Sequence, residues 1–162
     1  MPALWRPMRT ADLASVVALA DQIHRDHPER PEVFAERLAL APATCFALAD
    51  GDALLGYALA HPWAGAPPKL DSLLGAPPPR PDHLYLHDVA LARAARGRGA
   101  ARAVVAALDT VARGLGLGEM RLIAVSGSAP AWARLGFSDA DAPCPASYGA
   151  DARAMRRTIP AA

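Results

Sequence analysis

The sequence predicts a single α/β domain of the α+β kind, in which helices flank a central mixed sheet that is mostly antiparallel. Its 162 residues suggest one domain, long enough to bury a core without disulfides or metals. Apolar residues make up 52% of the chain and charged residues 20%, an ordinary globular balance. Stretches with helical apolar spacing alternate with short apolar runs in the order β-α-α-β-β-β-α-β-α-β, which indicates a mixed fold.

The first elements are a strand and two helices. Residues 4–8, LWRPM, predict a short strand, and Thr10 suits the N-cap of the helix that follows. Apolar residues recur at helical spacing across residues 13–23. The segment 26–31, DHPERP, interrupts this helix, and Pro31 suits the first turn of a second one.

A hairpin and a long loop come next. Residues 44–50 and 53–63 predict two strands that are joined by a tight turn at 51–52. Residues 62–82 then hold seven prolines, a density that no regular helix or central strand survives. Because the chain on either side is too short to fold alone, we interpret 62–82 as a proline-rich loop insertion within one domain, residues 1–162.

The remaining elements complete the predicted core. Residues 84–91, LYLHDVAL, are largely apolar on both faces and predict a central strand. A strong helical pattern covers 101–114 and ends at a glycine. Residues 120–125 predict a strand, 128–137 a short helix, and 152–159 a final strand.

Charge and composition exclude several classes of protein. Seventeen basic residues against sixteen acidic ones give a net charge of +1, so we expect no nucleic-acid partner. No apolar run approaches a membrane span and the start of the chain lacks a signal-peptide core, so we expect a cytoplasmic protein without a membrane partner. Cys45 and Cys144 form neither a disulfide framework nor a zinc pattern, so we expect packed thiols.

The stretch 93–102, RAARGRGAAR, lies between the central strand and the strong helix. Gly97 and Gly99 let the backbone turn sharply and let a ligand approach closely. The amides that follow lie at a helix N-terminus, unpaired and partially positive, which suits a phosphate or pyrophosphate. Arg96 and Arg98 add charge and bidentate donors. We therefore predict an anion-binding loop.

Other interpretations of glycine-rich stretches fit less well. A Walker A loop needs a glycine–lysine pair, and a dinucleotide fingerprint needs glycine where Arg102 stands. The glycines of 114–118 follow a helix and precede a strand, which is typical of a helix end and turn. An arginine–glycine tract that binds RNA would be longer and disordered. A solvated basic loop stays open as the alternative.

Two stretches together resemble a known family. Residues 87–108, HDVALARAARGRGAARAVVAAL, are similar to motif A of the GNAT superfamily of N-acetyltransferases, in which Arg96, Gly99 and Ala101 fill the motif positions. Residues 128–137, SAPAWARLGF, resemble the second element of that family, usually written A-x-x-F-Y-x-x-x-G-F. The order of elements matches over roughly residues 3–160, so the resemblance implies a GNAT-like fold.

The resemblance also implies a reaction and a cofactor site. It implies acetyl-CoA-dependent transfer of an acetyl group to a primary amine, by direct attack in a ternary complex, without a metal. The implied cofactor-binding residues include the backbone of the central strand, the anion loop and the short helix. They are Val89, Ala90, Leu91, Arg96, Gly97, Arg98, Gly99, Ala100, Ala101, Ser126, Pro130 and Arg134.

The chemistry needs a base for the amine, and the thiolate leaving group gains from an acid. Many members of the family place a tyrosine in the short helix as that acid, but Trp132 stands there. Tyr148 is the substitute that we predict; otherwise the thiolate leaves without a side-chain acid. His87 and Asp88 are candidate bases on the central strand, and we expect them to point to opposite faces.

The acceptor is expected to be a small-molecule amine or a peptide or protein amine, and the protein a monomer or homodimer. The resemblance implies that Trp5, Trp63 and residues 24–31 border the acceptor site. Two alternatives stay open. One is a non-catalytic acyl-CoA-binding sensor or regulatory module, and the other is an acyltransferase with another acyl donor or an O-acceptor.

Overall fold

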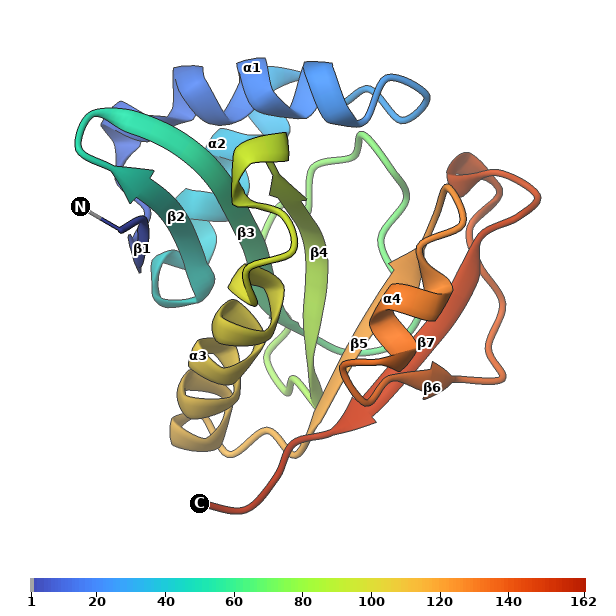
Figure 1. Cartoon of the computed structure of the whole chain (residues 1–162). Coiled ribbons are helices and arrows are strands. Elements are labelled where there is room, and N and C mark those ends of the chain that lie inside the picture. The colour runs from blue at the N-terminus through green and yellow to red at the C-terminus, as the bar shows by residue number, and fades with distance from the viewer. Residues whose placement is uncertain (1) are drawn as a thin grey trace.

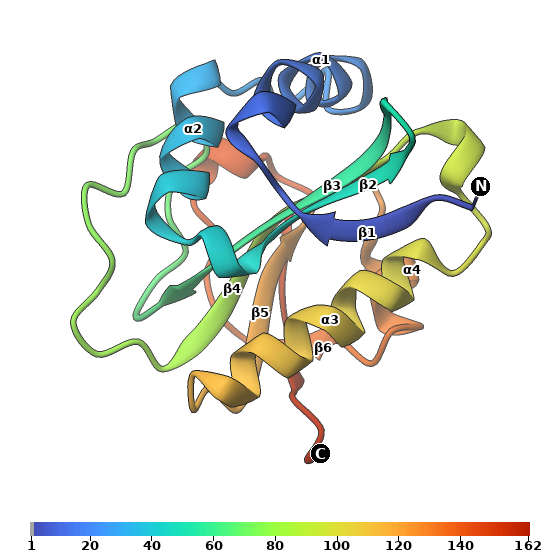
Figure 2. The ribbon, with the colours of Figure 1, turned by 90° about the vertical axis from the view of Figure 1, so that its left-hand side faces the viewer.

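A computed structural model describes residues 2–162, which form one domain with a seven-stranded sheet (Figure 1). Helices α1 and α2 cover one face of the sheet, and α3 covers the other (Figure 2). The strands are β1 (Leu4–Pro7), β2 (Cys45–Asp50), β3 (Ala53–Trp63), β4 (His83–Leu91), β5 (Glu119–Ala124), β6 (Ser138–Asp139) and β7 (Arg153–Thr158). The helices are α1 (Leu13–Ile23), α2 (Pro31–Leu40), α3 (Ala100–Gly114) and α4 (Ala129–Ala133), with short 3-10 turns at η1 (Thr10–Asp12), η2 (Pro42–Thr44), η3 (Arg93–Ala95) and η4 (Ala146–Tyr148).

The sheet has the strand order β1-β2-β3-β4-β5-β7-β6. Every pair of neighbouring strands is antiparallel except β4 and β5. That parallel pair is short, because only Leu84 with Met120 and Tyr85 with Arg121 are in register. Beyond these residues β4 and β5 separate, and a V-shaped gap opens between them (Figure 1). The predicted mixed, mostly antiparallel sheet flanked by helices is confirmed.

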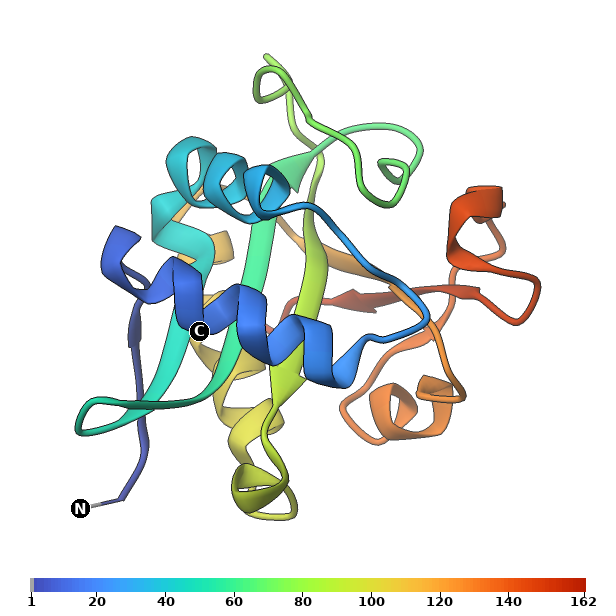
Figure 3. The ribbon, with the colours of Figure 1, turned by 90° about the horizontal axis from the view of Figure 1, so that it is seen from above.

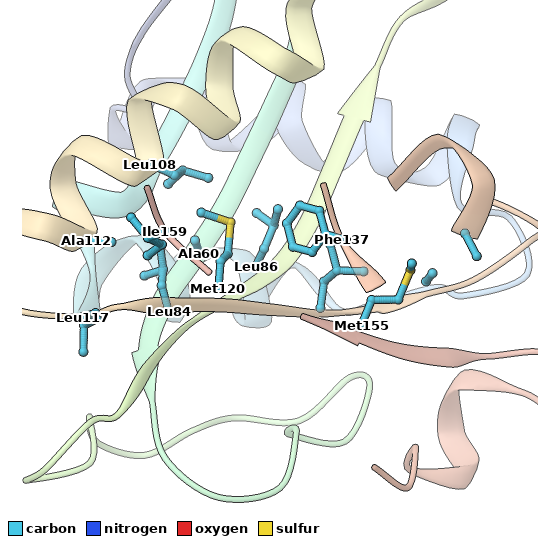
Figure 4. Packing of buried hydrophobic residues seen from close by; sticks show 13 residues of the cluster. Ala60, Leu84, Leu86, Leu108, Ala112, Leu117, Met120, Phe137, Met155 and Ile159 are labelled. Carbon is cyan, nitrogen blue, oxygen red and sulfur yellow. The ribbon is translucent and has the colours of Figure 1, made fainter. Parts of the chain in front are cut away.

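Two apolar cores lie on the two faces of this sheet. Under α3, Leu108 packs among Ala60, Leu84 and Met120, which come from three strands (Figure 4). Under α1 and α2, the core includes Tyr57, Leu59 and Ala90 from β3 and β4, together with Val16 and Phe34 from the helices. Strand β4 contributes to both cores, as the apolar character of both its faces predicts.

The start of the first helix differs from the prediction. Thr10 does not cap α1; it opens the 3-10 turn η1, and α1 begins at Leu13. Asp12 stabilises this turn, because its carboxylate accepts from the Arg9 amide at 2.7 Å and from two guanidinium nitrogens of Arg6 at 2.8 Å. The carboxylate of Asp12, which also pairs with Arg6, gives the amide of Arg9 a charged acceptor, so the hydroxyl of Thr10 is not needed there.

Residues 64–82 join β3 to β4 and contain no helix or strand. No helix among residues 2–162 is long and apolar enough to cross a membrane. The two cysteines are free thiols, and burial raises the pKa of Cys45 to about 12, as expected for a packed thiol.

Candidate active site

A cavity of about 840 Å³ occupies the gap where β4 and β5 separate. One wall is the second half of β4, and the opposite wall runs from the end of β5 to α4. The loop before α3 borders the cavity at one end. The segment between α1 and α2, Leu70 of the proline-rich loop and Tyr148 border it at the other end.

The loop before α3 presents unpaired backbone amides. Gly97 and Gly99 have φ angles of 71° and 76°, which L side chains rarely adopt, and α3 begins directly after them. Within residues 2–162, the amides from Gly97 to Arg102 donate no hydrogen bond. Trp5 of β1 donates its indole N–H to the carbonyl of Ala100 at 2.9 Å, which anchors the loop from outside. Unpaired amides at the start of a helix can receive an anion, so the geometry is compatible with the predicted anion-binding loop.

The backbone of β4 also faces the gap. Ala92 donates to Leu55 of the neighbouring strand β3 at 2.8 Å, and alternate residues of an antiparallel strand bond the same neighbour. The amides of Val89 and Leu91 therefore point away from β3, toward the space that β5 has left. The Arg96 guanidinium donates to the carbonyl of Leu91 at 3.1 Å, which ties the anion loop to this strand.

Most of the predicted cofactor residues line the cavity, but two do not. Those that line it are Val89, Ala90, Leu91, Arg96, Gly97, Gly99, Ala100, Ala101, Ser126 and Arg134. Pro130 and Arg98 are exposed and lie outside it, since Pro130 is on the outer side of the one-turn helix α4 and Arg98 points to solvent between two glycines. Trp132 lies at the cavity wall and packs edge-on against Phe137, with ring centroids 5.5 Å apart.

The expectation that His87 and Asp88 point to opposite faces of β4 is wrong. The register between β3 and β4 shifts between Leu59 and Ala60, which pair with Asp88 and Leu86, so His87 is the extra residue of a β-bulge. A bulge places two successive side chains on one face. Both side chains consequently turn toward the segment between α1 and α2, and both line the cavity.

Asp88 is held by two partners. His24 Nε2 lies 2.7 Å from Asp88 Oδ1, and the hydroxyl of Tyr57 donates to the other carboxylate oxygen. Burial would raise the pKa of Asp88, but the hydrogen bonds and the positive charge of His24 outweigh it, so its pKa lies below the ordinary value. Burial opposes protonation of His24, but Asp88 outweighs it and raises the pKa of His24. The two residues form an ion pair whenever the His24 ring is protonated.

His87 is held by one partner through one ring nitrogen, and its other ring nitrogen is buried without a partner among residues 2–162. Its Nε2 lies 2.8 Å from Glu29 Oε1, and both side chains are almost fully buried. Because a carboxylate only accepts, Nε2 carries the proton, and Nδ1 is then an acceptor in the neutral ring. Nδ1 has no hydrogen-bond partner within residues 2–162. The pair has the arrangement of a base that a carboxylate orients.

Tyr148 borders the cavity from η4, but its hydroxyl is engaged. It donates to the carbonyl of Pro68 at 3.0 Å and lies 3.1 Å from the hydroxyl of Tyr85. Burial raises the pKa of Tyr148 to about 12. The phenol is therefore a weaker acid than an exposed tyrosine.

Several contributors to the site were not predicted individually. His24 and Glu29 belong to a stretch of mixed charge that by itself indicates no chemistry, and their partners lie on β4, far along the chain. Trp5 was expected beside the acceptor site, but it contacts the anion loop instead. Trp63 does not line the cavity; its indole donates to Ala66 at the start of the proline-rich loop. Across residues 2–162, no group of three or more histidine, cysteine, aspartate or glutamate side chains is placed to hold a metal ion.

A mixed sheet that opens between its parallel strands, with unpaired amides at the start of the following helix, is the architecture of an acetyltransferase. The comparison of the sequence with protein families assigns the same class. The chain belongs to the acetyltransferase (GNAT) family, whose model matches residues 11–137. The resemblance seen in the sequence is therefore confirmed, and the protein is an acyltransferase.

Solved structures share the whole fold at low sequence identity. Ard1 from Thermoplasma volcanium is 14% identical with a TM-score of 0.76, over 99% of this chain and 100% of that one. The ribosomal-protein-S18-alanine N-acetyltransferase from Escherichia coli is 19% identical with a TM-score of 0.68, over 99% and 96%. N-acetylglutamate synthase from Neisseria gonorrhoeae, complexed with coenzyme A and N-acetyl-glutamate, is 17% identical with a TM-score of 0.74, over 99% of this chain and 36% of that one. No curated protein is significantly similar to the chain in sequence.

Proposed function

We propose that the protein transfers the acetyl group of acetyl-CoA to a primary amine by direct attack in a ternary complex. The observation that carries this proposal is the shared cavity. Unpaired amides of the anion loop border one end of it, and the buried pair of His87 and Glu29 borders the other. A single cavity thus joins a site for a phosphorylated donor to a base for the acceptor.

The residues present fit coenzyme A. The amides from Gly97 to Arg102 are donors without acceptors, and a pyrophosphate supplies several acceptor oxygens. The amides of Val89 and Leu91 face the gap and suit an amide-containing pantetheine arm, with Ala90, Ser126 and Arg134 completing the walls. Acetyl-CoA supplies the acetyl group as a thioester, and the chain positions it.

His87 acts as the base in this proposal. Its Nδ1 accepts the proton that the amine loses as the new C–N bond forms, and Glu29 stabilises the imidazolium through Nε2. Asp88 is less suited, because its lowered pKa makes it a weak base and its oxygens are engaged by His24 and Tyr57. We assign Asp88 the role of holding His24 and the end of α1 beside the cavity.

The C–S bond breaks as the amide forms, and the thiolate leaves without a proton from the protein. A phenol with a pKa of about 12 does not protonate a thiolate whose conjugate acid has an ordinary pKa of about 8.5. The Tyr148 hydroxyl also donates to Pro68 already. We therefore propose that Tyr148 ties the proline-rich loop in place, and that coenzyme A leaves as the thiolate and takes up its proton from the buffered solvent after release.

One experiment tests donor binding together with catalysis. Release of coenzyme A is followed with a thiol reagent over a panel of primary amines, and binding of coenzyme A is measured by calorimetry. Gly99→Ala forces a side chain into the left-handed region at a cost of roughly 1–2 kcal/mol, so we expect weaker binding by about tenfold or more. Gly114→Ala, at the other end of α3 with an ordinary φ, is the matched control and should bind normally.

The same experiment separates the alternatives. Tight binding of acetyl-CoA without release on any amine would favour the non-catalytic sensor. Release only with alcohols, or only with a longer acyl donor, would favour the other acyltransferase reactions. Equal affinity of the Gly99→Ala and Gly114→Ala variants would refute the assignment of the anion loop.

A further inference from the structure

Residues 67–75 of the proline-rich loop, here called the strap, are bonded to the segment between α1 and α2. Asp71 Oδ1 accepts from the backbone amide of Arg30 at 2.7 Å and from its guanidinium at 3.2 Å. The amide of Asp71 donates to Glu29 Oε2 at 3.0 Å. Further along, the amides of Leu74 and Gly75 donate to the carboxylate of Glu36 on α2. One side of the strap is therefore fixed to the helices above the sheet.

The other side of the strap is bonded to the segment around η4. The amide of Leu70 donates to the Ser147 hydroxyl at 3.0 Å, and Tyr148 donates to the carbonyl of Pro68 at 3.0 Å. His27, between α1 and α2, donates from Nε2 to the carbonyl of Tyr148 at 3.1 Å. Three segments that are far apart in the sequence are thus bonded to one another in pairs.

These three segments form a closed ring of contacts around the acceptor end of the cavity. Each contributes a side chain to its lining: Glu29 from the first, Leu70 from the strap and Tyr148 from the third. Figure 3 shows the light green proline-rich loop and the red segment around η4 close together on one side of the molecule. If the acceptor were a peptide, the chain beyond its reacting N-terminus would have to pass through this ring. A small amine has no such chain and can lie entirely within the cavity.

We propose that the strap closes the acceptor end, so that the acceptor is a compact primary amine and not the N-terminus of a polypeptide. This inference rests on the proposed function of the same cavity. The strap would then make the site specific by steric exclusion, because a polypeptide would clash with it and a compact amine would not. The strap also reaches the base, because the Glu29 carboxylate that accepts from Asp71 through Oε2 holds His87 through Oε1.

The charges at the acceptor end narrow the choice of probe. Asp88 is paired with His24, and Glu29 with His87, so each carboxylate there already has a partner within the protein. Ile23 and Leu70 add apolar surface. A compact amine with an uncharged body, such as phenethylamine, is the suitable small acceptor.

The test measures binding and needs no turnover. Two conjugates are compared by calorimetry, in which coenzyme A is joined through an acetyl bridge either to phenethylamine or to the N-terminus of a pentapeptide. We expect the full-length protein to prefer the small conjugate by about tenfold or more. Asp71→Gly removes the carboxylate that holds Arg30 and suits the positive φ of 55° at this position. Combined with Ser147→Ala, it should reduce the preference to about threefold or less by tightening the peptide conjugate.

The control is Asp52→Gly, which makes the same change at an exposed turn between β2 and β3 and should keep the full preference. Hydrogen exchange of residues 67–75 checks that the double variant has released the strap. Equal affinity of the wild type for both conjugates, or an unchanged preference after release of the strap, overturns the inference while the proposed function stands. Failure of the wild type to bind coenzyme A overturns both.

Discussion

His87 and Asp88 are neighbours in the chain, but we propose different roles for them in the site. The bulge in β4 turns both toward the same cavity, but their partners differ. Asp88 pairs with a histidine whose pKa it raises, and the pKa of Asp88 is itself lowered. His87 pairs with a carboxylate that fixes its tautomer and leaves Nδ1 as an acceptor. At the scale of single residues, the hydrogen-bond partner decides which of the two side chains can accept a proton.

We expect a substitution at His87 to lower kcat and a substitution at Tyr148 to lower mainly the free energy of unfolding. His87→Gln removes the base, so kcat should fall roughly 100-fold or more while the affinity for coenzyme A is unchanged. Tyr148→Phe removes a hydroxyl that ties the strap but takes no part in proton transfer. It should lower kcat by less than about threefold and the free energy of unfolding by about 1 kcal/mol. Steady-state kinetics and urea unfolding measure the two effects.

The outcome for Tyr148 decides between two roles. A fall in kcat of about 100-fold in Tyr148→Phe, with little change in stability, would restore the phenol as the acid for the thiolate. A normal kcat in His87→Gln would instead move the base to Asp88 or to water that Glu29 binds.

At the scale of elements, α3 has to present its first amides at a fixed place, and a buried ion pair attaches it to the sheet. Arg157 of β7 donates to both carboxylate oxygens of Asp109 on α3, at 2.6 and 3.0 Å, and both side chains are largely buried. Breaking such a pair leaves an uncompensated buried charge. Asp109→Asn should therefore lower the free energy of unfolding by about 3 kcal/mol.

A matched pair elsewhere provides the control for this prediction. Asp139 and Arg153 are 2.6 Å apart, but both side chains are more than half exposed. Water screens an exposed pair, so Asp139→Asn should cost less than about 1 kcal/mol. Thermal unfolding of the two variants distinguishes them, and equal losses would show that burial does not determine the strength of the Asp109 pair.

Most of the elements were predictable, while the two-residue strand β6, the bulge and the ring of contacts were not. Apolar spacing located β4 and α3 to within a residue or two, because a buried face must repeat with the period of its helix or strand. A bulge in a strand that is apolar on both faces leaves no mark on such a pattern, so the shared face of His87 and Asp88 was missed. The contacts of Asp71 and Glu29 join distant segments, and local composition does not encode them.

At the scale of the whole molecule, buried histidines of opposite behaviour determine how stability depends on pH. Burial and nearby positive charges lower the pKa of His61, on β3, to about 3. Burial also lowers the pKa of His83. The pKa of His24 is raised, because its attraction to Asp88 exceeds the effect of burial. Because the pKa values of these histidines differ between the folded and unfolded states, the free energy of unfolding depends on pH.

The signs of these shifts predict a stability maximum near pH 6.5. A raised folded pKa makes the contribution of His24 complete below its ordinary value of 6.5, and this contribution is lost as the pH rises through the folded value. The lowered pKa of His61 has the opposite effect: its contribution is complete above 6.5 and is lost as the pH falls toward 3. Between pH 6.5 and about 4.5 this loss should be on the order of 3 kcal/mol.

Urea unfolding at closely spaced pH values between about 4.5 and 8 tests this dependence. His61→Gln removes the titrating group at the buried position, so its stability should fall less steeply than that of the wild type below pH 6.5. Asp88→Asn removes the partner that raises the pKa of His24, so the loss of stability above pH 6.5 should flatten. A wild-type curve that stays level from pH 6.5 to 4.5, or a His61→Gln curve parallel to it, would show that His61 is not buried in its neutral form. Each variant changes one flank of the curve, so the two contributions are separated within one set of measurements.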